Sequence, residues 1–212
     1  MIHPPEERRD DMSVAEEHIK EYAMKDLFRG ELVRLTSEEP ESRAKHEVRW
    51  QRDTEFHRLA NEDPAELNSE KKIRGWGEKF AEDGFKPARY PFSIRALADD
   101  QVIGFMGLWV ELIQSEGWVG IGIGERDYWG KGYGTDAMKL CLQFAFMELG
   151  LQRVSLGLHE YNARALKSYE KAGFRLEGHT RQDVLREGKR TNTLWMGVLR
   201  DEWLQLKNGE RS

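Results

Sequence analysis

A glycine-rich segment in the second half of the chain has the composition of an anion-binding loop. Its sequence is Trp129-Gly-Lys-Gly-Tyr-Gly-Thr135, with glycine at every second position. Glycine lets the backbone approach a ligand without a clash from a Cβ atom. The segment leads directly into an apolar helical pattern, so its backbone N–H groups and the positive end of the helix dipole should converge on one spot that suits a phosphate. Lys131 adds a positive charge and Thr135 a hydroxyl.

The spacing of this loop leaves three interpretations open. A nucleotide P-loop requires G-x-x-x-x-G-K-[ST], but here Gly132 follows Gly130 and Lys131. A dinucleotide fold requires G-x-G-x-x-G directly after a strand. This loop has G-x-G-x-G and lies several residues beyond the strand pattern, which disfavours an NAD-type oxidoreductase. The third interpretation is a tight strand-to-helix turn that binds no ligand.

A second motif follows the next predicted strand, with the sequence Asn162-Ala-Arg-Ala-Leu-Lys-Ser-Tyr-Glu-Lys-Ala-Gly-Phe174. With both motifs in this order, the chain resembles the GNAT N-acetyltransferases, whose pyrophosphate motif is R/Q-x-x-G-x-G/A and whose later signature is N-x-x-A-x-x-x-Y-x-K-x-G-F. The loop and the closing segment Leu194–Trp203 are similar to the branch that acetylates ribosomal-protein N-termini, spermidine and some antibiotics. Trp129 stands where many members carry arginine or glutamine, while the backbone cradle from Gly130 to Gly134 is intact.

The resemblance implies the GNAT fold, a mixed α/β (α+β) architecture. Its twisted sheet is flanked by helices and contains one parallel pair of strands that splay apart. Residues 30–204 are expected to form the N-acetyltransferase domain. Residues 1–29 are then a partly helical N-terminal extension, and residues 205–212 a C-terminal tail.

The resemblance also implies acetyl-CoA as the cofactor and acetyl transfer to a primary amine by direct attack in a ternary complex. The pantetheine arm would pair with the backbone before the loop, as an added strand would. Asn162 would cap its own helix and reach the same arm. The expected cofactor-binding residues are Ile121, Gly122, Ile123, Trp129, Gly130, Lys131, Gly132, Tyr133, Gly134, Thr135 and Asn162.

Tyr169 matches the family tyrosine that protonates the leaving thiolate. It lies seven residues after Asn162, two helical turns on, so both side chains could face the sulfur. An aromatic residue in a helix–sheet core is the alternative. A backbone N–H near Ile123 is expected to stabilise the oxyanion.

The general base is the least defined part of the site. Members of this branch often have an acidic residue near the position of Trp118, and its absence keeps open a non-catalytic acyl-CoA-binding or sensory module. The carboxylates near this position are equally explained as solvated charges in turns. His159, at a predicted strand end, has an ordinary pKa that suits a general base. Deprotonation of the amine through a chain of water molecules fits the sequence equally well. The candidate bases are Glu111, Glu116, Glu125 and His159.

The acceptor class follows from the branch alone: a small-molecule amine such as a polyamine, or a protein N-terminus. Four tryptophans either line the acceptor cleft or, as large residues usually do, pack in the core. An aromatic and partly acidic pocket would suit a cation. These tryptophans are Trp50, Trp76, Trp109 and Trp118.

The elements that must position these residues follow from hydrophobic periodicity and turn signals. A strand, a helix and a strand over residues 117–158 imply a parallel pair with a crossover. The predicted strands are 30–35, 91–97, 102–112, 117–123, 153–158, 174–177 and 191–199. The predicted helices are 14–28, within 38–59, 69–82, 131–149 and 162–172. The first of these helices suggests a packing arm, for example at a homodimer contact.

The amino-acid composition restricts the class of protein and the kinds of partner. With 39% apolar and 33% charged residues among 212, the chain is expected to be one soluble domain with a short extension. Its net charge of −5 argues against nucleic acid as a partner, because phosphate contacts need a basic face. No apolar run fits a membrane span or a secretory signal, and no metal-ligand cluster occurs. The single cysteine, Cys141, fits a reducing, cytoplasmic location.

Overall fold

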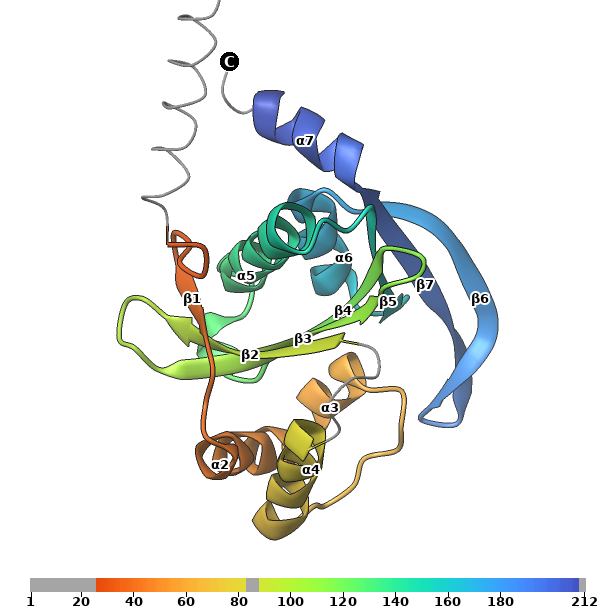
Figure 1. Ribbon diagram of the computed structural model, residues 1–212. Coiled ribbons are helices and arrows are strands. Elements are labelled where there is room, and N and C mark those ends of the chain that lie inside the picture. Colours follow the sequence, from red (N-terminus) through yellow and green to blue (C-terminus); the bar gives the residue numbers. More distant parts are fainter. Residues whose placement is uncertain (1–25, 83–87, 210–212) are drawn as a thin grey trace, which may run out of the picture.

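A seven-stranded mixed sheet forms the centre of the molecule, as the computed structural model in Figure 1 shows. The structure describes residues 26–82 and 88–209. The strand order is β1-β2-β3-β4-β5-β7-β6, in which β4 and β5 are parallel and all other neighbours are antiparallel. The strands are β1 (Val33–Thr36), β2 (Ala88–Ala96), β3 (Val102–Glu111), β4 (Glu116–Ile123), β5 (Arg153–His159), β6 (Arg175–Arg186) and β7 (Lys189–Leu199).

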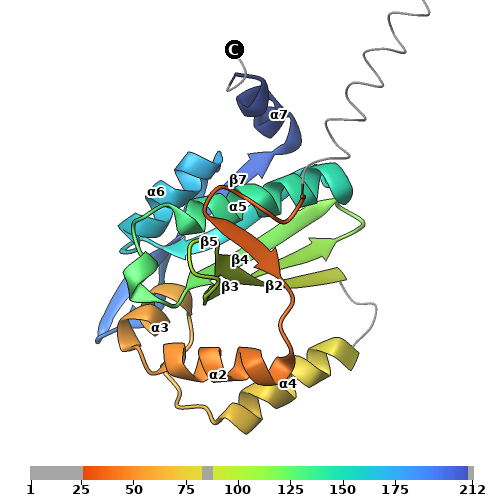
Figure 2. The same cartoon turned by 90° about the vertical axis from the view of Figure 1, so that its left-hand side faces the viewer.

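Helices cover both faces of this sheet (Figures 1 and 2). The helices α5 and α6 lie on one face, and α2, α3 and α4 lie on the other. This arrangement confirms the predicted mixed α/β architecture. The helices are α2 (Pro40–Gln51), α3 (Thr54–Ala60), α4 (Glu70–Glu82), α5 (Tyr133–Gln143), α6 (Ala163–Ala172) and α7 (Arg200–Gly209), with a 3-10 helix at Arg126–Tyr128 and a π-helix at Phe144–Glu148.

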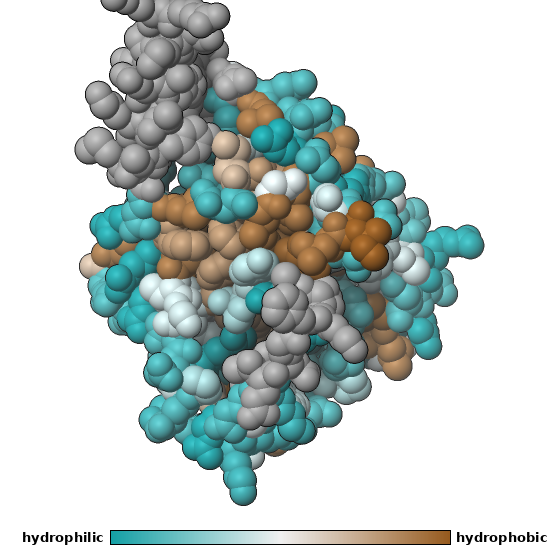
Figure 3. All heavy atoms as spheres, viewed as in Figure 1, coloured by the Kyte–Doolittle hydropathy of each residue, from teal (hydrophilic) through white to brown (hydrophobic). Residues whose placement is uncertain are grey.

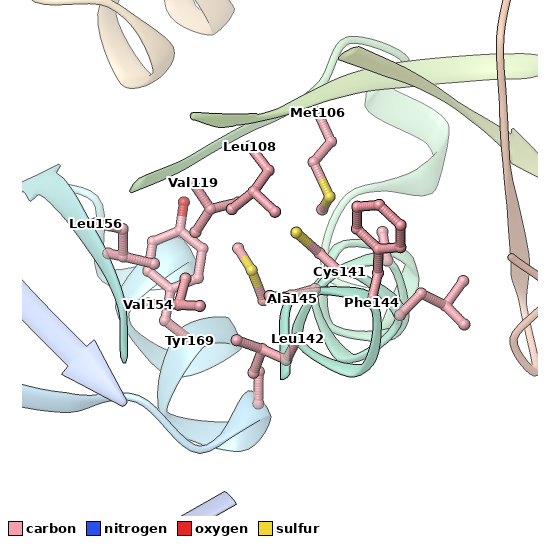
Figure 4. Close-up of a cluster of buried hydrophobic side chains, with 14 of the residues drawn as sticks. Met106, Leu108, Val119, Cys141, Leu142, Phe144, Ala145, Val154, Leu156 and Tyr169 are labelled. Carbon is pink, nitrogen blue, oxygen red and sulfur yellow. The ribbon is translucent and has the colours of Figure 1, made fainter. Parts of the chain in front are cut away.

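The helix α5 fills the main core. Ala137, Met138, Cys141 and Leu142 have no accessible surface, in agreement with the apolar pattern around the whole helix. Figure 4 shows the Cys141 side chain pointing toward Met106 of β3. Burying a side chain of the size of Met138 or Leu142 contributes about 1.5–3 kcal/mol to folding. This packing therefore fixes the helix whose first turn follows the glycine loop.

A smaller aromatic cluster attaches α2 and α3 to the opposite face. Trp50 of α2 and Phe56 of α3 have ring centroids 6.4 Å apart, and both contact Phe105 of β3. The Trp50 indole N–H donates to Glu125 at 2.7 Å. Gly124 leaves room for this ring, since a Cβ there would lie 2.2 Å from Trp50. The cluster thereby holds α3 over the end of β4.

Several predicted boundaries differ from the structure for local reasons. The first strand was expected from residue 30 but begins at Val33, because the amides of Leu32 and Val33 donate to the Asp136 carboxylate at 2.8 and 3.0 Å. The long helix predicted over residues 131–149 ends its α-helical part at Gln143 and continues as a π-helix, in which the Leu149 amide donates to the Phe144 carbonyl at 3.1 Å.

The ends of the chain carry two further differences. The expected helix over residues 14–28 lies mostly outside the described residues, and its last two positions form a turn. The helix α7 was not predicted and runs through residues expected as a tail. Among the described residues, no helix has the length and apolar character needed to cross a membrane. Figure 3 shows apolar residues gathered in a band at the level of the sheet.

Candidate active site

The parallel strands β4 and β5 separate along their length, as predicted. They pair at three positions only, ending with Trp118 and Ser155. Beyond that point β4 stays paired with β3 as far as Ile123, and β5 stays paired with β7 as far as His159. The outer neighbours therefore hold the two strands apart, and a split opens from residues 119 and 156 onward.

A polar cluster fixes the closed end of the split. Ser155 Oγ donates to the Glu116 carboxylate at 2.7 Å, and Arg153 Nε donates to the same oxygen at 3.1 Å. Arg153 also donates to Glu177 of β6 at 2.7 Å. These contacts join β4, β5 and β6 where the split begins, and they occupy the Glu116 carboxylate that the sequence offered as a base.

The glycine loop presents unpaired amides at the open end of the split. The α-helical hydrogen bonds of α5 begin with the Asp136 amide and the Gly132 carbonyl at 2.9 Å. The amides of the three residues between them therefore have no partner within the helix. Gly130 and Gly132 have φ values of +71° and +95°, which are strained for other residues. The loop conformation thus depends on glycine, and its free donors suit an anion.

A cavity of about 510 Å³ extends from this loop into the split. Most of the expected cofactor-binding residues line it, whereas the exposed Lys131 does not. Basic side chains of α5 and α6 that the sequence interpretation missed lie on its wall: Lys139, Arg164, Lys167 and Lys171. Expected residues on the wall are Ile121, Gly122, Ile123, Trp129, Gly130, Gly132, Tyr133, Gly134, Thr135, His159, Asn162 and Tyr169.

Trp129 anchors the loop to β4 and carries a cation on its ring. Its indole N–H donates to the Ile123 carbonyl at 2.6 Å. The Arg164 guanidinium lies 3.8 Å from the ring centroid, within the range of a cation–π contact. Burial lowers the pKa of Arg164, although a guanidinium remains charged. The position of Arg164, two residues after Asn162 at the start of α6, was the feature of the sequence that could have indicated a cation at this site.

Two expected polar ligands already have protein partners. Asn162 accepts from the Ala165 amide at 3.1 Å, which caps α6, and donates to the Leu59 carbonyl of α3 at 3.2 Å. The Thr135 hydroxyl bonds to Ser168 of α6 at 2.8 Å. An amide has two donors and an acceptor with two lone pairs, so Asn162 retains capacity for a ligand.

Tyr169 lies inside the cavity wall, in the core between α6 and the sheet. Burial raises the pKa of Tyr169 to about 12, so the hydroxyl is neutral and able to donate a proton. It makes no hydrogen bond to any residue in the described part of the chain. Figure 4 shows its hydroxyl end beside Val119, at the start of the split.

His159 and Glu111, the other catalytic candidates, occupy opposite ends of the site. His159 is buried in the cavity wall, where its Nε2 lies 3.1 Å from the Asn61 carbonyl and its Nδ1 has no partner among the described residues. Glu111 lies at the closed end, opposite Glu116, and accepts from the Ile113 amide at 3.2 Å. The structure does not bring Glu111 to the cavity, and Glu125 is bound to Trp50.

The four tryptophans divide between core and surface. Trp50 is 3% exposed and packs in the core, so it does not line a cleft. Trp76 is exposed on α4, with the Lys72 ammonium 5.1 Å from its ring. Trp109 and Trp118 are exposed side by side on the sheet, in register on β3 and β4.

Curated proteins similar to this chain are acetyltransferases. A probable N-acetyltransferase of Bacillus subtilis (strain 168), YjcK, is 32% identical over 117 residues, which is 54% of this chain and 61% of that protein. The spermidine N(1)-acetyltransferase of Escherichia coli (strain K12) is 31% identical over 78 residues, 37% of this chain and 42% of that protein. The aligned part thus spans less than two thirds of either relative.

Solved structures share the fold over most of the chain. The spermidine N-acetyltransferase from Vibrio cholerae, in complex with CoA and spermine, has a TM-score of 0.69 at 21% identity and covers 81% of this chain and 98% of that one. An acetyltransferase (GNAT family) from Bacillus anthracis has a TM-score of 0.68 at 16% identity, covering 82% and 98%. The family model of the acetyltransferase (GNAT) domain matches residues 31–175, so this chain belongs to the GNAT acetyltransferase family.

Proposed function

We propose that the chain is an N-acetyltransferase that moves an acetyl group from acetyl-CoA to a primary amine by direct attack in a ternary complex. The split between β4 and β5 is the observation that carries this proposal. It connects the free amides at the start of α5 with the hydroxyl of Tyr169, and a cavity follows it throughout.

The residues of the cavity fit the cofactor. The amides of Tyr133, Gly134 and Thr135 would hold the pyrophosphate, and the Arg164 guanidinium on Trp129 adds a fork-shaped donor for a phosphate. Bound acetyl-CoA supplies an activated acetyl group as a thioester, which transfers to the amine with departure of the thiolate. The exposed Lys131 would contribute its charge from outside the cavity.

Backbone donors of β4 point into the split. The Gly124 amide donates to the Ile103 carbonyl of β3 at 2.8 Å. Because N–H groups alternate sides along a strand, the amides of Val119, Ile121 and Ile123 point away from β3. The Val119 amide completes the last ladder pair, Trp118 with Ser155, so the amides of Ile121 and Ile123 face the split. They would pair with the pantetheine arm. The Ile121 amide is the first of these beyond the last ladder pair, and we therefore favour Ile121 over the Ile123 region for stabilising the oxyanion.

Tyr169 and His159 divide the proton transfers. The Tyr169 hydroxyl, neutral because burial raises its pKa to about 12, would donate to the departing sulfur. The contact of His159 Nε2 with the Asn61 carbonyl places a proton on that nitrogen, which leaves Nδ1 as an acceptor. Because His159 lies four residues along β5 from Ser155, at the open end of the split, Nδ1 would receive the proton of the amine attacking beside Tyr169 through water.

The acceptor class rests on similarity. The branch resemblance and the spermidine acetyltransferases among the relatives support a small polyamine or a protein N-terminus. Trp118, at a position where the branch often has an acidic residue, favours one alternative: a module that binds acyl-CoA without turnover.

Two measurements test the proposal. Calorimetric titration should show binding of acetyl-CoA and CoA but not of NAD, and Gly132→Val should weaken CoA binding. Thiol release over a panel of amines should show turnover that depends on both substrates, with intersecting initial-rate plots. Binding without thiol release from any amine would support the acyl-CoA module and refute the enzyme. The homodimer expected from residues 1–29 stays a prediction for sedimentation analysis.

A further inference from the structure

Three tryptophans share the sheet face opposite α5 and α6. Trp109 and Trp118 are 40% and 43% exposed, and Trp195 of β7 is half-buried. Their strand neighbours Leu108, Val110 and Val119 are buried in the main core. Since side chains alternate between the faces of a strand, these indoles point toward the other side.

The indoles stand around the start of the split on that face. Trp118 is the last residue of β4 that pairs with β5, so it marks the apex. Trp109 covers Gly120 on the β4 side, where an added Cβ would lie 3.3 Å from the ring. Trp195 covers Gly157 on the β5 side, where an added Cβ would lie 2.8 Å away. Both glycines line the cavity, so the rings of Trp109 and Trp195 lie against the outer side of its wall, next to Trp118 at the apex.

The arrangement is held by specific contacts. The rings of Trp118 and Trp195 meet edge to face, with centroids 5.9 Å apart at 86°. The Trp195 indole N–H donates to the Thr180 hydroxyl of β6 at 2.6 Å. Within the described ranges, the contacts of lysine and arginine with indole rings fall on other tryptophans. The ring contact and the indole hydrogen bond thus hold Trp118 and Trp195 in place.

Carboxylates beside the opening are largely neutralised. Glu116 and Glu177 both pair with Arg153, and this guanidinium lowers the pKa of Glu177. Glu111 remains as an exposed carboxylate two residue pairs beyond Trp118, away from the split. A polyamine needs carboxylates for its other ammonium groups. Glu62 on the cavity wall is one exposed carboxylate, whereas the surface beside the apex is mainly aromatic.

We propose that the three indoles select an acceptor whose primary amine is carried on a flat aromatic body, within a few bonds of the ring. Aromatic rings pack on indoles in offset or edge-to-face geometry, which would direct the amine into the split. The inference rests on the proposed acetyl transfer and narrows its acceptor away from polyamines. Both an arylalkylamine and a protein N-terminus that begins with an aromatic residue have this chemistry.

The test compares kcat/KM for thiol release by the full chain with matched amines. Phenylethylamine and tryptamine represent the small aromatic amines, and butylamine and spermidine the aliphatic ones. Two peptides that differ only in an N-terminal phenylalanine or serine represent protein N-termini. We expect at least a tenfold preference for the aromatic member in the small-amine arm or in the peptide arm. The arm that shows this preference identifies whether the acceptor is a small aromatic amine or a protein N-terminus.

Variants assign the preference to the indoles. Trp118→Ala should remove the aromatic preference while leaving CoA affinity unchanged, which also verifies the fold. Trp109→Ala should reduce it, and Trp76→Ala, an equally exposed tryptophan on α4, should not. A higher kcat/KM for spermidine than for the aromatic amines, or an equal loss of kcat/KM for all amines in Trp118→Ala, overturns this inference. Either result leaves the proposed acetyl transfer intact. Absence of turnover with every amine overturns both.

Discussion

Removal of the Tyr169 hydroxyl is the most direct test of the chemistry at the split. The substitution Tyr169→Phe deletes one oxygen and keeps the ring that packs near Phe174, with centroids 6.1 Å apart. The hydroxyl bonds to no residue of the described ranges, so its loss should change the free energy of unfolding by less than about 1 kcal/mol. Any large effect on turnover can then be assigned to the reaction.

The size of the effect follows from the pKa values involved. The Tyr169 pKa of about 12 lies above that of an ordinary thiol, about 8.5. A difference of about 3.5 units opposes full proton transfer by about 4.8 kcal/mol, so the proton moves only as the carbon–sulfur bond breaks. We therefore expect the lower end of the range for general acids, about 10²-fold in kcat, or about 2.7 kcal/mol.

The assay is thiol release under saturating acetyl-CoA and amine, together with calorimetric CoA affinity. Tyr169→Phe should lower kcat while the dissociation constant for CoA stays within about twofold, as expected for loss of a transition-state interaction. Tyr90→Phe removes a hydroxyl from a half-buried tyrosine outside the cavity and should leave kcat unchanged. Unchanged turnover in Tyr169→Phe would exclude this residue from the chemistry and refute the reasoning.

The same pKa predicts a stability effect with a defined sign. The native state keeps the Tyr169 proton up to about pH 12, whereas the unfolded chain loses it near pH 10. The contribution of Tyr169 to stability is therefore present below pH 10 and is lost as the pH rises toward 12. Tyr169→Phe should lose less stability than the wild type over this window, measured by urea unfolding.

Three further predictions concern the loop, the cap and the cysteine. Gly132→Val should raise the CoA dissociation constant at least about tenfold, while Gly150→Val, also at positive φ but with open space around it, should leave that constant unchanged. Asn162→Ala should lower the free energy of unfolding by about 1–2 kcal/mol through loss of the α6 cap, and an unaltered urea midpoint would contradict this. Burial raises the pKa of Cys141 to about 12, so a disulfide reagent should not react with the native protein, and rapid labelling would disprove the packing.

Structural features that depend on residues close in the chain could be predicted from the sequence. Gly150 and Gly173 follow their helices at positive φ, as glycine directly after a helical pattern predicts. The apolar run of α5 indicated a buried helix, and the helix between two strands indicated a parallel pair. The splay itself came only through the family resemblance, because it depends on β3 and β7 holding β4 and β5 from the outside.

Features that depend on distant pairing could not be read from the sequence. Glu111 is seven residues from Trp118, but the β3–β4 hairpin sets it opposite Glu116 at the closed end of the split. Trp195 reaches the opening only because β7 pairs with β5, where Gly157 lies opposite it. Local periodicity contains no information on such registers, so neither placement was predictable.

The open split needs a physical explanation, since two parallel strands normally pair along their length. Trp129 occupies the Ile123 carbonyl, and Asn162 links α6 to the Leu59 carbonyl, so groups at the open end already have partners. Both strands also keep their outer ladders. Among the described residues, the amides of Ile121 and Ile123 are then the β4 donors without a fixed partner, and unpaired amides in a protein interior cost free energy. A cofactor arm that pairs with them removes this cost, so the same backbone that leaves the split open also favours its occupation.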